Sequence, residues 1–363
     1  MKTMTNRTNT SRLLTSVVVL TALGSTACDT YSRDDILFRR GVPTAKDLAL
    51  EPPGAETDDE ESAEGAGASS VRQGLEACFD ESLRCTTQNI ATGFNGLTRG
   101  LLAIVDAVRR FPATQREPGR RVWGPHFVRE EDRTYRFEMV KNLDANDEYD
   151  GSITFCFHAA RGRVEGAWQD SLDCTIVDDP GSGLTRVLSG VIRPGEDDEG
   201  SARSGSGTLL LDANRMASVN DDRSLLGVIA IDYDNTSEPK TISMTITDVE
   251  DVDANPVPDN ADYAFVLYDD GSGTFDFVLK SDFHNPNLFA ESLLETLDIR
   301  ARWQADGAGR AEASASGGDI MLGTWDVTEC WDAELSTTWR RSDDPGVGPI
   351  GDDEALDCPI APF

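Results

Sequence analysis

Residues 87–111 read TQNIATGFNGLTRGLLAIVDAVRRF and form the only long stretch of the chain with a clear helical period. Its large apolar side chains recur at steps of three and four residues, namely Ile90, Phe94, Leu97, Leu101, Ile104 and Val108. This spacing places them on one face of an α-helix, and small residues such as Gly93 flank that face. Thr86 or Thr87 can cap the start of the helix, and Pro112 ends it. We therefore expect one long amphipathic helix here.

Most of the chain after this helix alternates between apolar and polar residues, which is the period of a β-strand. In the sequence LDIRARW at residues 297–303, for example, apolar side chains occupy every second position. Turn clusters such as DDGSG at residues 269–273 separate these runs, which is a hairpin signal. We expect roughly ten to twelve strands, and the fourteen candidate runs lie near residues 121–128, 133–141, 151–159, 163–176, 184–193, 205–211, 225–233, 240–249, 262–269, 273–281, 294–304, 310–316, 320–330 and 335–341.

These patterns together predict the fold class. The protein is expected to be mainly β with N-terminal helices. Its strands should form a large antiparallel meander, a half-barrel or curved sheet, packed on the one long amphipathic helix. The small residues beside the apolar stripe of the helix predict close approach of its backbone to the sheet.

The first 27 residues have the form of a signal peptide. They combine three basic residues with an apolar run at residues 13–23, followed by the small residues Gly24, Ser25, Thr26 and Ala27. Eleven residues are too few to span a bilayer as a helix. We therefore expect residues 1–27 to be removed on export.

The small residues directly before Cys28 resemble a bacterial lipoprotein signal, in which this cysteine becomes N-terminal and carries the lipid. Ser25 departs from the leucine that is usual three residues before the cysteine, and residues 25–27 also suit ordinary signal peptidase. Cysteine parity favours lipidation, because six of the seven cysteines then remain to pair, whereas ordinary cleavage leaves one free thiol. We expect a palmitate-bearing Cys28 that anchors an exported protein to a membrane of the cell envelope, facing the periplasm or the cell surface.

The other six cysteines predict disulfides, because an exported chain meets an oxidising compartment. They are Cys78, Cys85, Cys156, Cys174, Cys330 and Cys358. The sequence leaves many pairings open, although the order along the chain favours 78 with 85, 156 with 174 and 330 with 358. The first pair requires a helix to end before Cys85, since residues seven apart in one helix lie about 10.5 Å apart along its axis. No CxxC spacing occurs, so no zinc site is expected.

The domain organisation follows from composition. Residues 28–69 show no periodicity, and the part from residue 51 onward is rich in proline, glycine and acidic residues. We expect a lipidated cysteine and a disordered acidic linker with a reach of about 35 Å, and no part of residues 34–50 in the core. Residues 70–363 should form a single β-rich domain with an N-terminal helical hairpin, whose first helix lies near residues 70–83, and a C-terminal tail tied by a disulfide.

The charge of the chain limits its partners. The formal charge is -32, and it becomes -35 when Lys2, Arg7 and Arg12 leave with the signal peptide. Such a surface repels nucleic acid and anionic lipid headgroups. We expect no nucleic-acid partner.

No residues are arranged in a known catalytic signature. The chain contains no GxSxG, HExxH, Walker or dinucleotide-binding motif. Its three histidines, His126, His158 and His284, have no neighbouring signature, so we interpret them as structural or surface residues. We expect no enzyme activity and no cofactor.

One acidic stretch resembles a metal-binding loop. Residues 251–262 (DVDANPVPDNAD) space their oxygen ligands as a calcium loop does, but Pro256 stands where such loops need glycine. We interpret this stretch as an acidic hairpin loop and expect no metal, while calcium binding stays open.

Two short segments carry a resemblance to a protein family. GAGRAEASASGGD at residues 307–319 and TECWD at residues 328–332 resemble uncharacterised bacterial envelope lipoproteins that combine a signal peptide, an acidic linker and a β-rich domain. The expected architecture is also distantly similar to the half-barrels of lipoprotein carriers, whose concave sheet holds acyl chains.

The resemblance implies no activity, and two functions remain open for this architecture. In the first, the protein is an anchored envelope or surface lipoprotein with a structural or interaction role and an envelope protein as partner. In the second, the concavity of the sheet binds a lipid or another apolar ligand. The glycine-rich flank of the long helix favours the first, because it indicates a filled concavity.

Overall fold

The structure is a computed structural model, and it describes the following residues: 34–38, 41–44, 46–53, 82–109, 112–129, 132–164, 173–179, 183–196, 202–212, 227–249, 259–281, 294–318, 320, 324–343, 348–358, 360 and 361. The predicted signal peptide, Cys28, residues 54–69 of the predicted linker and nearly all of the predicted helix near residues 70–83 lie outside these ranges.

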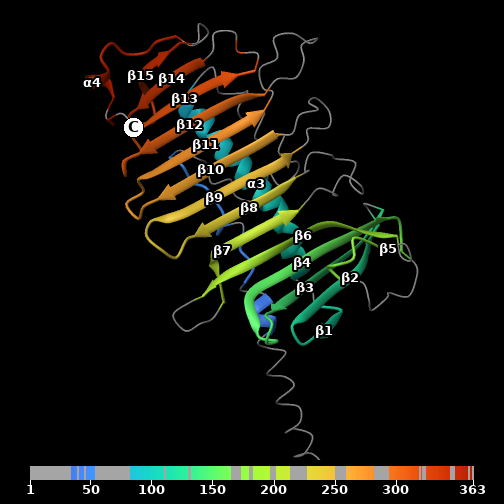
Figure 1. The fold of residues 1–363 in the computed structure, drawn as a ribbon. Helices are drawn as coiled ribbons and strands as arrows, with labels where there is room; N and C mark the ends of the chain where they lie inside the picture. The colour runs from blue at the N-terminus through green and yellow to red at the C-terminus, as the bar shows by residue number, and fades with distance from the viewer. Residues whose placement is uncertain are drawn as a thin grey trace, which may run out of the picture.

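One antiparallel sheet of fifteen strands makes up most of the described chain (Figure 1). Fourteen strands lie side by side in the order of the sequence, and the short β5 pairs with β6 beside this path. The strands are β1 (Gln115–Glu117), β2 (Arg120–Val128), β3 (Arg133–Leu143), β4 (Tyr149–Arg161), β5 (Asp178–Asp179), β6 (Leu184–Glu196), β7 (Ala202–Asp212), β8 (Val228–Asp234), β9 (Lys240–Val249), β10 (Asp259–Leu267), β11 (Gly273–Ser281), β12 (Glu295–Trp303), β13 (Gly309–Gly317), β14 (Thr324–Trp331) and β15 (Thr337–Ser342). The predicted antiparallel meander is confirmed.

The predicted strand positions agree closely with the structure, with one exception. Those at residues 240–249 and 273–281 coincide with β9 and β11. The strand predicted at residues 163–176 is wrong in its described part, because residues 173–177 form turns that a disulfide holds beside β4. Two strands, β1 and β5, are not predicted from the sequence, since runs of three and two residues are too short to show an alternation.

The apolar positions of the strands build one continuous core. On β9 to β12 every second side chain is buried, as the alternation predicts, and those side chains are Ile242, Met244, Ile246, Ala261, Tyr263, Phe265, Phe275, Phe277, Leu297, Ile299, Ala301 and Trp303. The intervening side chains on this part of the sheet are exposed, such as Thr241, Ser243 and Asp276, or partly exposed, such as Val278 and Asp298. One face of these strands is therefore apolar, and we call it the apolar face.

The long helix α3 (Leu83–Arg109) begins four residues before the predicted start. The predicted capping role of Thr86 and Thr87 is wrong, because both hydroxyls donate to carbonyl oxygens one turn earlier, those of Ser82 and Leu83. The side chain of Ser82 takes the capping position instead and accepts a hydrogen bond from the backbone N–H of Cys85 at 3.4 Å.

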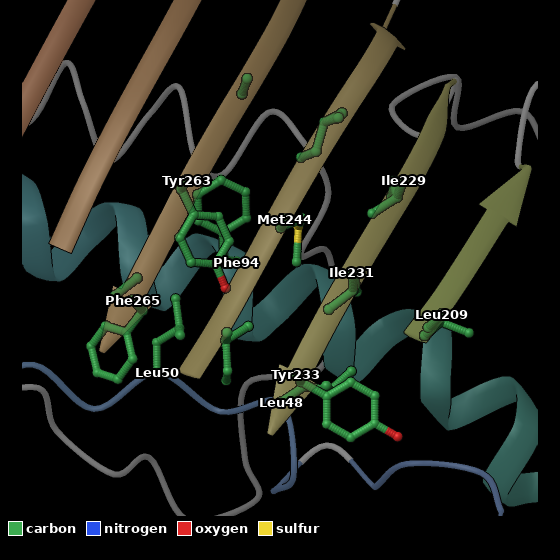
Figure 2. Packing of buried hydrophobic residues seen from close by; sticks show 14 of the residues in the cluster. Leu48, Leu50, Phe94, Leu209, Ile229, Ile231, Tyr233, Met244, Tyr263 and Phe265 are labelled. Carbon is green, nitrogen blue, oxygen red and sulfur yellow. The ribbon is translucent and has the colours of Figure 1, made fainter. Parts of the chain in front are cut away.

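The first half of α3 carries aromatic contacts to the sheet. Phe94 stacks on Tyr263 of β10 with ring centroids 4.5 Å apart (Figure 2). It also meets Phe277 of β11 edge-on at 6.1 Å. Ile90 and Leu102 are also buried. The other members of the predicted stripe, the side chains of Leu97, Leu101, Ile104 and Val108, lie outside the described part of the chain.

A segment that was predicted as linker belongs to the core. We call residues 34–38, 41–44 and 46–53 the N-terminal segment, in which Phe38, Val42, Leu48 and Leu50 are all buried. The prediction that nothing in residues 34–50 joins the core is therefore wrong. These side chains are irregularly spaced along the chain, so they show neither a helical nor a strand period. The predicted disorder of residues 28–33 and 54–69 stays a prediction.

Candidate functional site

The apolar face is the first candidate site, because an apolar ligand would have to bind there. The N-terminal segment lies along it, and Figure 2 shows Leu48 and Leu50 directed into the same cluster as Tyr233 of β8 and Phe265 of β10. Phe94 enters this cluster from α3. In the described part of the chain, the protein's own side chains thus occupy this part of the apolar face.

Hydrogen bonds fix the N-terminal segment to α3. The side-chain amide of Asn95 accepts from the backbone N–H of Leu50 at 2.7 Å and donates to the carbonyl of Leu50 at 2.7 Å. The amide of Gln88 donates to the carbonyl of Pro53. Because Asn95 meets residue 50 and Gln88 meets residue 53, the segment runs antiparallel to the helix. The segment therefore pairs specifically with α3 rather than resting loosely on it.

Two tyrosine hydroxyls are the polar groups of this otherwise apolar region. Tyr233 and Tyr263 are buried, and neither hydroxyl has a hydrogen-bond partner among the described residues. Burial raises the pKa of both groups, because the phenolate form would lose its hydration. Both side chains are therefore neutral, and each offers a hydroxyl donor on the apolar face.

The second candidate site is a buried cluster of charged side chains on the other face of β3 and β4, which we call the ionic cluster. Glu138 is fully buried at 0% exposure. Its Oε1 accepts a hydrogen bond from Arg120 Nε at 2.5 Å, and its Oε2 forms an ion pair with Arg136 Nη2 at 2.7 Å. The β3–β4 register places Arg136 directly opposite His158 and Glu138 opposite Cys156. Strand alternation alone thus brings these four side chains together.

The disulfide segment, residues 173–179, lies beside this cluster. The Cys156–Cys174 disulfide joins it to β4, and β5 pairs with β6. His158 Nε2 lies 2.9 Å from the carbonyl oxygen of Ile176, and Arg186 donates to the carbonyl of Cys174 at 2.5 Å. These contacts explain why a strand face that alternation predicts as polar and exposed is buried here.

The charges of the ionic cluster are set by burial and by pairing. Burial lowers the pKa of Arg136 and of His158, because the charged form of each loses hydration. The hydrogen bond that Arg120 donates to Glu138 raises the pKa of Arg120. His158 is therefore held neutral, and Glu138 pairs with both guanidinium groups.

The chemistry open to this cluster is limited by its disulfide. Ligand atoms of Glu138, Cys156 and Cys174 lie within 4.8 Å of one another, which is the spacing of a metal site. Both sulfurs are joined to each other, however, so neither is a thiolate that could bind a metal. The arrangement is that of a structural ion-pair network.

The predicted cysteine pairs have different outcomes. The Cys156–Cys174 and Cys330–Cys358 disulfides are present, which confirms two of the three predicted pairs and fits an oxidising compartment. Cys85 is also disulfide-bonded, and its predicted partner Cys78 lies outside the described residues. The break that this pair requires exists, since α3 starts at Leu83 after a non-helical Ser82.

The remaining candidate residues are scattered. His126 is exposed on β2, His158 is buried in the ionic cluster, and His284 lies outside the described residues. Of the acidic stretch 251–262, only residues 259–262 are described; they belong to β10, which pairs antiparallel with β9. The ionic cluster was missed because one sequence cannot tell a covered polar strand face from an exposed one.

No protein-family model matches the chain, and neither the curated proteins nor the solved structures include a significantly similar one. Among the described residues, no helix is long and apolar enough to cross a membrane.

Proposed function

We propose that this protein is a membrane-anchored envelope or surface lipoprotein with a structural or interaction role, whose sheet is filled by the chain's own N-terminal elements. The observation that carries the proposal is the burial of Leu48, Leu50 and Phe94 against the apolar face. An apolar face that is already covered offers little area to a ligand. The two disulfides fit an exported protein, and the predicted signal peptide with Cys28 provides the anchor.

The proposal extends the packing of Phe94 to the whole of α3. The helix would lie across the sheet as an apolar rod, and the curved sheet would close around it as a half-barrel. The aromatic contacts of Phe94 support this arrangement. The resemblance to envelope lipoproteins fits the same reading, with an envelope protein as partner and no catalytic step.

Two measurements test the proposal. The full chain, expressed with its signal peptide and labelled with a clickable palmitate, should incorporate label, and the Cys28→Ala variant should not. Protein purified from its native membrane should carry no stoichiometric lipid in native mass spectrometry followed by lipid extraction. Equal labelling of both chains would contradict the proposed lipid anchor. One bound lipid per chain would contradict the proposal that the protein's own side chains fill the core.

A second function, binding of an amphipathic or apolar ligand on the apolar face, is favoured by one observation. The hydroxyls of Tyr233 and Tyr263 are buried without a partner among the described residues, and a polar ligand group could accept from them. Under this alternative the extracted protein carries lipid, and replacement of both residues by phenylalanine changes that cargo. Under the filled-core proposal the double variant carries nothing and folds normally.

A further inference from the structure

We propose that the lipid anchor holds one particular end of the sheet against the membrane, namely the end formed by the β1–β2 turn and the β3–β4 turn. This inference rests on the proposed lipidation of Cys28 and specifies which surface of the protein then meets the bilayer. Its basis is the place where the folded N-terminal segment begins, together with the short length of chain that separates it from the anchor.

The N-terminal segment is fixed at this end from its first residues. Asp34 is 6% exposed, and its carboxylate accepts from the backbone N–H of Gly119 at 2.7 Å and lies 3.3 Å from the ammonium group of Lys141. The next residue, Asp35, receives Arg121 Nε at 2.7 Å. Gly119 lies in the β1–β2 turn and Lys141 near the end of β3, so these contacts place residues 34 and 35 at one end of both strands.

Phe38 continues the attachment into the core. Its side chain is buried, and the guanidinium group of Arg121 lies over its ring at 5.6 Å. In Figure 1 the first blue helical turn, residues 34–38, lies beside β1 and β3. The chain is therefore held at this place by both charge pairing and apolar burial.

The distance from the anchor follows from covalent geometry. Six residue steps separate Cys28 from Asp34, and even fully extended they span at most about 20 Å. A linker that ran to residue 69 would have let the body stand about 35 Å from the membrane. With Asp34 fixed, the β1–β2 turn stays within about 20 Å of the lipidated cysteine.

The surface at this end has side chains that suit the edge of a bilayer. Leu143, at the end of β3, is 55% exposed, and Ile36 of the N-terminal segment is 50% exposed. Each lies two residues from a partner in the Asp34–Lys141 ion pair, so both belong to the same end. Exposed leucine and isoleucine side chains gain free energy on entering the interfacial layer of a membrane.

The charges at this end decide which lipids it tolerates. Lys141 and Arg116 lie there, but so do the exposed acidic residues of the β3–β4 turn, Asp144, Asp147 and Glu148. These carboxylates repel anionic headgroups. The partner is therefore a zwitterionic lipid surface. The short chain between Cys28 and Asp34, and not charge attraction, keeps this end in contact with it.

The experiment compares two exposed leucines near opposite edges of the sheet, one on the β3 side and one on the β15 side. Leu143→p-acetylphenylalanine and Leu356→p-acetylphenylalanine variants of the full chain, each coupled to a nitroxide, are purified in lipidated form and placed in phosphatidylcholine vesicles containing a lipid with a nickel-chelating headgroup. Leu356 is 82% exposed in α4 (Glu354–Asp357), beside β15. The path from β3 to β15 crosses a sheet that is on the order of 50 Å wide at about 4.8 Å per strand.

The expected result is a several-fold stronger nickel-induced relaxation of the nitroxide at position 143 than at position 356. The two positions carry the same apolar label, so insertion driven by the label itself would raise both signals. Insertion of thirty glycine and serine residues between residues 33 and 34 should bring the signal at position 143 down to that at position 356. Equal signals in the lipidated protein without the insertion, or a difference that survives the insertion, would overturn the inference.

Failure of the anchor gives a different result from failure of the inference. A chain that incorporates no palmitate overturns the proposed lipidation and this inference with it. A chain that incorporates palmitate and gives equal nickel relaxation at both positions overturns the inference alone, and the anchored-lipoprotein proposal then stands.

Discussion

Glu329 of β14 accepts the backbone N–H of Leu83, the first residue of α3, at a distance of 3.2 Å across 246 positions of the sequence. Its other carboxylate oxygen accepts from the hydroxyl of Ser82 at 2.6 Å. A carboxylate at a helix N-terminus satisfies backbone N–H groups that have no partner within the helix, and it interacts favourably with the helix dipole. The sheet thus fixes the point at which α3 starts.

Replacing this carboxylate should destabilise the protein measurably. We expect Glu329→Ala to lower the free energy of unfolding by about 1–3 kcal/mol, because the buried N–H of Leu83 and the half-buried hydroxyl of Ser82 lose their acceptor. Chemical denaturation monitored by circular dichroism measures the change. Asp326→Ala, at an exposed position of the same strand, is the control and should change the unfolding free energy by less than about 0.5 kcal/mol. Equal effects would mean that Glu329 does not support α3.

The N-terminal segment should contribute to stability as a core element does. We expect Leu50→Ala to cost about 2–5 kcal/mol, since a buried leucine leaves a cavity when it is truncated. The backbone bonds from residue 50 to Asn95 do not involve the deleted atoms, so the cost reports the side chain. The neighbouring exposed Glu51→Ala is the control for urea unfolding. Equal unfolding free energies of the two variants would mean that this segment is part of the linker and not of the core.

Two glutamates, one buried and one exposed, form ion pairs with the same arginine of the ionic cluster. Arg120 pairs with buried Glu138 at 2.5 Å and with Glu117, which is 57% exposed, at 3.2 Å. We expect Glu138→Ala to cost about 3–5 kcal/mol, because Arg136 is then left buried without its carboxylate. Glu117→Ala should cost at most about 1 kcal/mol, as exposed ion pairs do. Unfolding curves of both variants give the comparison, and similar costs would contradict the buried network.

His158 should make stability depend on pH. Burial lowers its pKa in the folded state, and the unfolded chain titrates near about 6.5, so below that pH the unfolded state binds more protons. Stability should therefore fall as pH drops below about 6.5, by up to about 1.4 kcal/mol per pH unit from this group. Arg136 and Arg186 lie opposite His158 in the register and oppose its protonation, and Glu138 favours it.

The measurement is the unfolding free energy at pH 7.5 and pH 5.5. His158→Gln keeps a side-chain amide that can donate to the Ile176 carbonyl and does not titrate, so its stability should fall less between the two pH values. Exposed His126→Gln is the control and should behave as the wild type. If the unfolding free energy of His158→Gln falls between the two pH values as much as that of the wild type, groups other than His158 cause the pH dependence.

The cysteines of the exported protein should all be oxidised except Cys28. Peptide mapping without reduction should recover the 156–174 and 330–358 pairs, together with 78–85, and thiol labelling should find no reactive cysteine. Serine replacement of either described pair should cost roughly 2–4 kcal/mol through the loss of loop constraint. A labelled thiol at Cys156 or Cys330 would contradict these pairings.

The sequence by itself determined most of the strands, the meander that they form and the apolar face. The alternation at residues 240–249 and 297–303 is local, because the pleat of a strand directs every second side chain to the same face. Short turn clusters between the runs favour hairpins, and successive hairpins give a meander. The position of α3 was predicted to within a few residues for the same reason, since its apolar period depends only on near neighbours.

Only the tertiary structure decided what covers each face. Leu48 and Leu50 have no period of their own, and they are buried because α3 and the sheet provide partners far away in the sequence. Glu138 and His158 alternate as exposed polar residues would, and a disulfide-linked segment covers them. Periodicity records which side of an element a residue occupies. Burial depends on whether another part of the chain can reach that side at a favourable free energy, and this is a property of the whole fold.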